Sequence, residues 1–95
     1  MKQLLWWLIA GTKGGINRAY ILRALKDRPY NANQLSELLK LDYKTVRHHL
    51  KVLLDNNIIV TSGESEKYGA MYFLSKATEE NYKIFEEIWE KIGKK

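Results

Sequence analysis

Apolar and polar residues in the middle of the chain follow the pattern of two short helices separated by a turn. Asn31 and Asp42 each precede a helical run and offer a side-chain oxygen to the free N–H groups of a helix N-terminus. The two helices are therefore expected to begin near Ala32 and Tyr43. Residues 40–42 are too few for anything except a turn, so the pattern predicts a helix-turn-helix.

The second of these helices, expected over residues 43–56, has one apolar side and one polar side. Successive residues of a helix point about 100° apart. On that spacing, the apolar side consists of Val46, Leu50, Leu53 and Leu54. The opposite side and its flanks consist of Lys44, Thr45, Arg47, His48, Lys51 and Asp55. Cations and hydrogen-bonding groups on the second helix of a capped pair favour a helix that reads the DNA major groove, and a merely solvated surface is the alternative.

A β-hairpin is expected directly after this helix. Residues 58–61 and 68–74 are rich in β-branched and aromatic side chains, and the segment between them is polar and contains glycine and serine. After a helix-turn-helix, such a hairpin forms the wing of a winged helix. The pattern leaves open which of residues 71–74 face the core, because nearly all of them are apolar.

Two helices are expected before the helix-turn-helix. The first is expected over residues 2–10, of which residues 4–10 are apolar on every side, and a glycine-rich break follows at residues 11–15. A second helix over residues 16–27 ends before Pro29, because the residue that precedes a proline disfavours helical geometry. Its outward side is expected to hold Arg18, Arg23 and Lys26.

The remaining helices complete the expected fold. The helix over residues 32–39 is expected to contribute to the core Leu35, Leu38 and Leu39. A last helix, from residue 75 or 78 to about residue 92, carries an apolar stripe at helical spacing. Together, the elements predict a mainly α fold with a small β-hairpin (α+β), in the order α-α-α-α-β-β-α and as a single domain over residues 1–95.

One segment is similar to a known family. DYKTVRHHLKVLLDNNIIV, residues 42–60, resembles the recognition helix and first wing strand of ArsR-type winged helix-turn-helix transcription regulators, in particular small archaeal members. The order of the expected elements extends the resemblance over almost the whole chain. The resemblance implies a homodimer that binds a specific sequence of double-stranded DNA, most often as a repressor. It also implies DNA contacts at the outward positions Lys44, Thr45, Arg47 and His48.

Other residues join the predicted DNA-binding set because of their positions. Asn33 lies at the start of a helix, where free N–H groups and the positive end of the helix dipole favour phosphate. Lys67 is the charged contact candidate of the wing, although two nearby glutamates reduce its attraction to phosphate. The complete set is Asn33, Tyr43, Lys44, Thr45, Arg47, His48, Lys51 and Lys67.

Charge is distributed unevenly along the chain. The formal net charge is +5. Residues 1–54 hold ten lysines or arginines and three aspartates or glutamates, whereas residues 55–95 hold six and eight. The half that contains the predicted helix-turn-helix is therefore the basic half, which favours a polyanionic partner on that side of the molecule.

The residue types disfavour an enzyme and a metal site. The chain has no cysteine, which excludes disulfides, thiolate metal sites and cysteine nucleophiles. His48 and His49 are adjacent, so their side chains diverge on a helix and do not chelate one ion. Metal-sensing members of the family use cysteines before the turn, or acidic and histidine ligands on the last helix, which here lacks histidine. The glycines of residues 11–15 lack the spacing of a phosphate-binding loop, and no cofactor is expected.

The terminal helices, about residues 2–10 and 76–92, suggest a second subunit. They carry more aromatic surface than a small domain readily buries, which favours pairing across a two-fold axis, and packing within one chain is the alternative. The expected interface consists of Leu5, Trp6, Leu8, Ile9, Tyr82, Phe85, Ile88, Trp89 and Ile92. The apolar N-terminal run is less than half the roughly 20 residues that span a bilayer, so a cytoplasmic protein is expected.

Two functions remain open at this point. The first is a sequence-specific, homodimeric DNA-binding transcription regulator. The second is a winged-helix adaptor that binds a protein partner and has no physiological DNA site. The adaptor predicts that exposed aromatic residues, rather than residues 44–51, make the partner contacts. No residue pattern identifies an effector ligand for either function.

Overall fold

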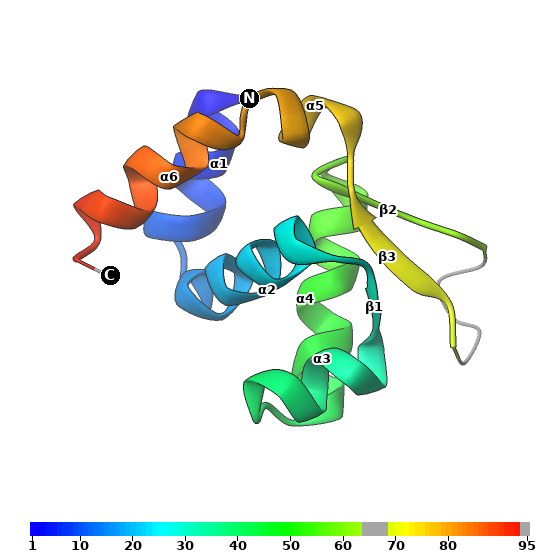
Figure 1. Ribbon diagram of the computed structural model, residues 1–95. Coiled ribbons are helices and arrows are strands. Elements are labelled where there is room, and N and C mark those ends of the chain that lie inside the picture. The colour runs from blue at the N-terminus through cyan, green and yellow to red at the C-terminus, as the bar shows by residue number, and fades with distance from the viewer. Residues whose placement is uncertain (64–68, 94–95) are drawn as a thin grey trace.

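The structure, a computed structural model, describes residues 1–63 and 69–93 of the 95-residue chain. Helices form most of it, and a small antiparallel sheet lies at one side (Figure 1). In chain order the elements are α1 (Lys2–Ala10), α2 (Gly15–Asp27), β1 (Tyr30–Asn31), α3 (Ala32–Leu39), α4 (Tyr43–Asp55), β2 (Ile59–Thr61), β3 (Met71–Leu74), α5 (Lys76–Glu80) and α6 (Tyr82–Lys91). The expected mainly α fold with a winged helix-turn-helix is confirmed.

Side-chain caps define where α3 and α4 begin. The Asn31 side chain accepts a hydrogen bond from the Gln34 backbone N–H at 2.7 Å, and the Gln34 side chain accepts one from the Asn31 N–H at 2.9 Å. Asp42 accepts hydrogen bonds from two N–H groups in the first turn of α4. Between the helices, Lys40 adopts the left-handed conformation with φ of 57°, which glycine often takes at a helix C-terminus. Both helices begin where the sequence predicts.

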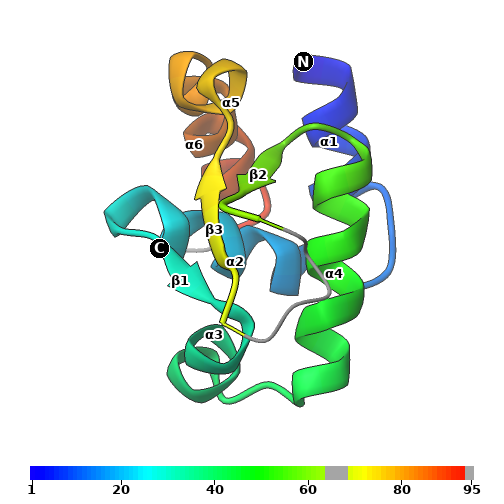
Figure 2. The same cartoon turned by 90° about the vertical axis from the view of Figure 1, so that its right-hand side faces the viewer.

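The wing belongs to a three-stranded antiparallel sheet with strand order β1-β3-β2. The predicted element order lacks β1, because two residues are too few to form a recognisable strand pattern. β1 pairs Tyr30 with Tyr72 and so ties the wing to the segment before α3 (Figure 2). Tyr72 and Leu74 face the core, whereas Phe73 is exposed opposite Val60. The hairpin strands are also shorter than predicted.

The predicted C-terminal helix consists of two helices, α5 and α6, with a break at Asn81. The Asn81 side-chain amide donates to the Ala77 carbonyl at 2.8 Å, a local bond that competes with helical hydrogen bonding. Ser75 caps α5 by accepting a hydrogen bond from the Thr78 backbone N–H. The buried Thr78 hydroxyl donates to the Ile58 carbonyl at 2.8 Å. These bonds join α5 to the start of the wing.

The core is formed by all the longer helices and the inner face of the sheet. Its largest fully buried side chains are Tyr72, Phe85, Leu5, Leu8, Ile21, Leu22, Leu35, Leu50, Leu53, Ile58, Ile59 and Ile88. The prediction that Leu38 joins the core is wrong, because this side chain is 52% exposed. α3 buries the side that contains Ala32 and Leu35, and Leu38 lies roughly 90° from the centre of that side.

α1 and α2 approach each other closely where they meet. A Cβ atom on Gly15 would lie 1.8 Å from the backbone oxygen of Ile9, so a larger residue would displace one of the helices. α1 and α6 also pack against each other, on the side of the molecule away from the wing (Figure 1). α3 and the wing lie on other sides of the molecule (Figure 1), which leaves them accessible together with the polar side of α4.

Candidate nucleic-acid interface

The polar side of α4 faces solvent. Its exposed side chains are Lys44, His48 and Lys51, and its partly exposed ones are Thr45 and Arg47. The three exposed residues are four and three positions apart, so they form one row along the helix. The opposite side packs into the core through Val46, Leu50 and Leu53. The two-sided helix that the sequence predicts is therefore confirmed.

A cleft of about 480 Å³ lies beside this row of side chains. Its lining consists of Lys44, Arg47, His48, Leu50, Lys51, Leu54, Asp55 and Tyr72. Arg47 donates a hydrogen bond from Nη1 to the Tyr72 hydroxyl at 3.3 Å, which holds the guanidinium toward β3. Lys51 and Asp55 form an ion pair at 3.2 Å, but both are exposed and such pairs stabilise a fold very little. The helix side of the cleft is thus rich in cations and hydrogen-bond donors.

The remaining predicted contacts lie near the start of each helix or in the wing. Asn33 is exposed in the first turn of α3, whereas the neighbouring Asn31 is occupied as a cap. Tyr43 is exposed at the start of α4. Figure 2 shows α3 beside the N-terminal end of α4, so both residues belong to one end of the helix pair. Lys67 lies outside the described residues, and the contacts of the whole set with DNA stay predictions.

Arg18 is buried, so the prediction that it lies on the outward side of α2 is wrong. Its side chain is 4% exposed. Nε donates to the Leu8 carbonyl at 3.0 Å, and Nη2 donates to the Thr12 hydroxyl and to the Lys13 carbonyl. Positions 18, 21, 22 and 25 share one face of a helix, and this spacing is the sequence signal that places Arg18 on the inner stripe. Arg18 thereby joins the end of α1 to the turn that follows it.

The same guanidinium reaches the inner side of α4. Its Nη1 lies 3.1 Å from Nδ1 of His49, whose side chain is also buried. Gly14, with φ of 85°, lies against the imidazole, and a Cβ atom there would be 2.8 Å from Cε1 of His49. Burial, followed by the charges of Arg18 and His48, lowers the pKa of His49 below its ordinary value. A buried polar contact therefore connects the α1–α2 turn to α4.

Residues 17–61, which run from α2 to β2, match the sequence profile of the family described as "Bacterial regulatory protein, arsR family". The chain contains an ArsR-family helix-turn-helix domain. This is a family of DNA-binding transcription regulators and not of enzymes. The match confirms the resemblance in residues 42–60 to this family.

Two solved structures share the fold of this ArsR-family domain. Reduced HlyU from Vibrio cholerae is 24% identical with a TM-score of 0.66, and the match covers 97% of this chain and 88% of HlyU. Staphylococcus aureus MarR, in complex with salicylate and kanamycin, is 23% identical with a TM-score of 0.68, and the match covers 80% of this chain. That match spans 52%, about half, of the MarR chain. A comparison with curated proteins gave no significant match.

Residues 1–63 and 69–93 contain neither a membrane-spanning helix nor a metal-binding group of side chains. No helix in these residues has both the length and the apolar character that a membrane crossing requires. Nor do these residues bring three or more histidine, cysteine, aspartate or glutamate side chains together in a group that would hold a metal ion.

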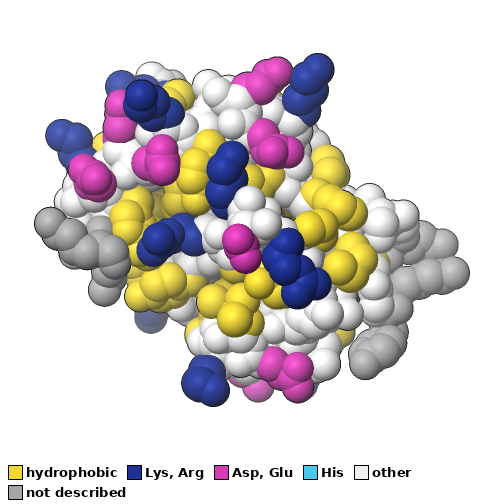
Figure 3. All heavy atoms as spheres, in the orientation of Figure 1, with side chains coloured by type: hydrophobic (Ala, Val, Ile, Leu, Met, Phe, Trp, Pro, Cys, Tyr) yellow, Lys and Arg dark blue, Asp and Glu magenta, His cyan; other side chains and the backbone are white. Residues whose placement is uncertain are grey.

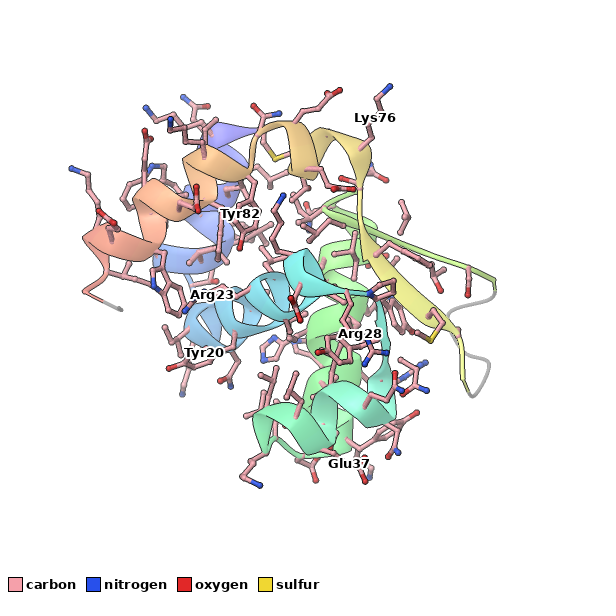
Figure 4. All side chains as sticks on the ribbon, viewed as in Figure 1. Tyr20, Arg23, Arg28, Glu37, Lys76 and Tyr82 are labelled. Atoms are coloured by element: carbon pink, nitrogen blue, oxygen red, sulfur yellow. The ribbon has the colours of Figure 1, made fainter. Side chains whose placement is uncertain are left out.

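The face of the molecule formed by α2 and α6 differs from the α4 face. Basic, acidic and hydrophobic side chains are interspersed over it (Figure 3). Arg23 lies over the Trp89 ring at 4.3 Å, and Lys26 lies over the Tyr82 ring at 4.9 Å. In Figure 4, Arg23 of α2 lies between Tyr82 of α6 and Tyr20 of α2. These cations cover aromatic rings of α6, so their first role is in packing.

Most of the residues predicted for a dimer interface are buried within the single chain. These are Leu5, Leu8, Ile9, Phe85, Ile88 and Trp89. Packing of α1 against α6 accounts for their burial without a second subunit. Trp6, Tyr82 and Ile92 remain partly exposed, and Trp7, outside the predicted set, is 56% exposed. The molecule therefore retains exposed aromatic surface on α1.

We expect Arg18→Met to lower the free energy of unfolding by about 2–4 kcal/mol, because it leaves several buried acceptors without a donor. Arg23→Met is the matched control on the same helix, and we expect it to cost less than about 1 kcal/mol because Arg23 is exposed. Urea unfolding followed by circular dichroism measures both variants. Equal losses of stability in the two variants would contradict the buried role of Arg18.

Proposed function

We propose that this protein is a homodimeric repressor that binds a specific sequence of double-stranded DNA, with α4 as the recognition helix in the major groove. The observation that carries the proposal is the row of Lys44, His48 and Lys51 on the exposed side of α4, the second helix of an ArsR-family helix-turn-helix. The major groove admits an α-helix and presents a distinct pattern of donors and acceptors for each base pair. A row of donors on a rigid helix suits that pattern.

The side chains of α4 divide by chemistry into two groups. Lys44 and Lys51 are long, exposed cations that suit phosphates or the acceptor atoms of guanine. Thr45 and His48 are shorter and suit base edges or the sugar–phosphate backbone. Arg47 is held by the Tyr72 hydroxyl, so less conformational freedom is lost when it contacts DNA. In this proposal, the lysines position the helix and the other side chains read bases.

Other proposed DNA contacts lie in α3, at the start of α4 and in the wing. Asn33 lies in the first turn of α3, where N–H groups and the helix dipole favour a phosphate. Tyr43 at the start of α4 and Lys67 in the wing are the other proposed contacts. The chain carries a formal charge of +5, and its basic excess lies in residues 1–54, which include α3 and most of α4. That excess strengthens association with any duplex and makes binding depend on salt.

A second subunit follows from the geometry of DNA. Two recognition helices related by a two-fold axis enter successive major grooves when they are about 34 Å apart, and the operator is then close to palindromic. A dimer that occupies such a site within a promoter excludes other proteins from it. Repression therefore needs no activity beyond binding.

The exposed side of α1 suits the contact between subunits. Gln3, Trp7 and Ala10 are exposed, uncharged and on one side of the helix. The exposed side of α6 instead contains Glu86, Glu87 and Glu90, which would face like charges near a two-fold axis. We therefore place Trp7 near the centre of the dimer contact. In this proposal, the partly exposed residues Trp6, Tyr82 and Ile92 lie around Trp7 in the dimer contact. The buried members of the predicted set pack in the core beneath the contact.

For Lys44→Ala we expect weaker binding to a selected duplex and a log–log salt slope that is smaller by about 0.9, because one phosphate contact is lost. Fluorescence anisotropy over a salt series gives both quantities. Lys83→Ala removes the same charge from the exposed side of α6 and should leave affinity and slope unchanged. If both variants lose affinity equally, binding depends on the overall charge of the protein and Lys44 makes no specific phosphate contact. If the native protein binds no duplex, the proposed function is wrong.

For Trp7→Lys we expect the dimer dissociation constant to rise about 30-fold, the effect of losing a well-packed aromatic residue at an interface. Val60→Lys is the control, since Val60 is similarly exposed, at 47%, but lies in the wing. Sedimentation equilibrium of the native protein and both variants provides the comparison. A native protein that is monomeric at micromolar concentration would eliminate the dimer, and equal weakening by both substitutions would eliminate α1 as its contact.

A further inference from the structure

A buried polar contact lies directly behind the proposed DNA-reading side of α4. Arg18 of α2 is 4% exposed and His49 of α4 is 5% exposed, and Nη1 of Arg18 lies 3.1 Å from Nδ1 of His49. The other donors of Arg18 bond to the Leu8 carbonyl, the Thr12 hydroxyl and the Lys13 carbonyl. One guanidinium thus links the end of α1, the α1–α2 turn and α4.

The chemistry of the two side chains requires a neutral His49. A guanidinium only donates hydrogen bonds, so Nδ1 of His49 must accept, and the imidazole proton must be on Nε2. A doubly protonated imidazole has no acceptor. Protonation would therefore remove this hydrogen bond and place a second positive charge beside Arg18 in a buried site.

Among residues 1–63 and 69–93, no charge acts on His49 in a way that would compensate for that proton. The charged or titratable groups that act on His49 are Arg18 from α2 and His48 from α4, and both disfavour the imidazolium. The α1–α2 turn contributes Gly14, which lies against the ring, and α1 contributes its Leu8 carbonyl, which accepts a hydrogen bond from Arg18. Burial acts in the same direction as these charges and lowers the pKa of His49. His49 is therefore neutral in the native state near neutral pH.

We propose that the Arg18–His49 hydrogen bond positions α4 for DNA binding and that a proton on His49 releases this contact and weakens binding. The inference rests on the proposed DNA-binding function. Since Gly14 leaves little space beside the ring, the two cations separate only if the α1–α2 turn or α4 moves. A movement of α4 displaces Lys44, His48 and Lys51 together, because they are on the same helix.

The direction of the pH effect follows from linkage. A histidine with a lowered pKa in the native state holds its proton less tightly there than in a state in which the contact is broken. The contact is therefore fully present above the ordinary histidine pKa and is lost as pH falls toward the lowered value. The other histidine of the chain, His48, lies next to His49 on the exposed side of α4.

The test separates the two histidines. His48→Asn is the reference protein, in which His49 is the one remaining histidine. His48→Asn/His49→Asn is compared with it, because asparagine places an amide oxygen where Nδ1 accepts but does not titrate. Duplex affinity is measured by fluorescence anisotropy at pH 7.5 and pH 5.5 at constant ionic strength. We expect the reference protein to lose affinity about threefold or more on acidification, and the double variant to change by less than about 1.5-fold.

A second measurement applies to the folded reference protein without DNA. Nuclear magnetic resonance of its single imidazole should show the Nε2–H form at pH 7.5, a pKa below the ordinary value, and shifts in the amide signals of residues 12–18 as the ring titrates. If the two proteins have the same pH dependence, or if the imidazole titrates without changes in that turn, the inference is wrong. Absence of duplex binding by the native protein at pH 7.5 would instead refute the proposed function, and the magnetic resonance result would still decide whether the contact senses protons.

Discussion

Burial of the apolar side of α4 is the interaction on which the rest of the structure depends. Its fully buried members are Val46, Leu50 and Leu53. Each such side chain contributes roughly 1.5–3 kcal/mol when it leaves water. Because a helix is rigid, the burial of one side also determines which residues lie opposite. The row of donors on the exposed side of α4 is thus a consequence of core packing. A change that rotated the buried side of the helix would rotate the exposed side equally.

Three polar contacts supplement that packing from different parts of the chain. Asp42 caps the first turn of α4, and the Tyr72 hydroxyl holds Arg47 from the sheet. Arg18 reaches His49 from α2 and is tied to the end of α1 by its other donors. The helix is therefore held at its start, at the side that faces the wing and at its back. This arrangement suits a reader of DNA, since base discrimination depends on the orientation of the helix as well as on its side chains.

Local signals made the helix-turn-helix predictable from the sequence. The burial of Arg18 and the extent of packing between α1 and α6 were not predicted, because they depend on contacts between distant residues. The caps at Asn31 and Asp42 act within one turn, so both helix starts follow from neighbouring residues. The break at Asn81 is also local, but asparagine does not end every helix. The burial of Arg18 depends on acceptors at the end of α1 and on α4, which only the folded chain brings together. Likewise, aromatic stripes in sequence cannot reveal that α1 and α6 bury much of their apolar surface against each other.

The central claim is that α4 enters the major groove of DNA, and methylation interference on a selected operator tests it most directly. Dimethyl sulfate methylates guanine at N7 in the major groove and adenine at N3 in the minor groove. We expect methylated guanines to prevent binding in two clusters whose centres are about 10–10.5 base pairs apart, one for each recognition helix. Interference confined to adenine N3, or binding that tolerates guanine methylation throughout the site, would contradict it.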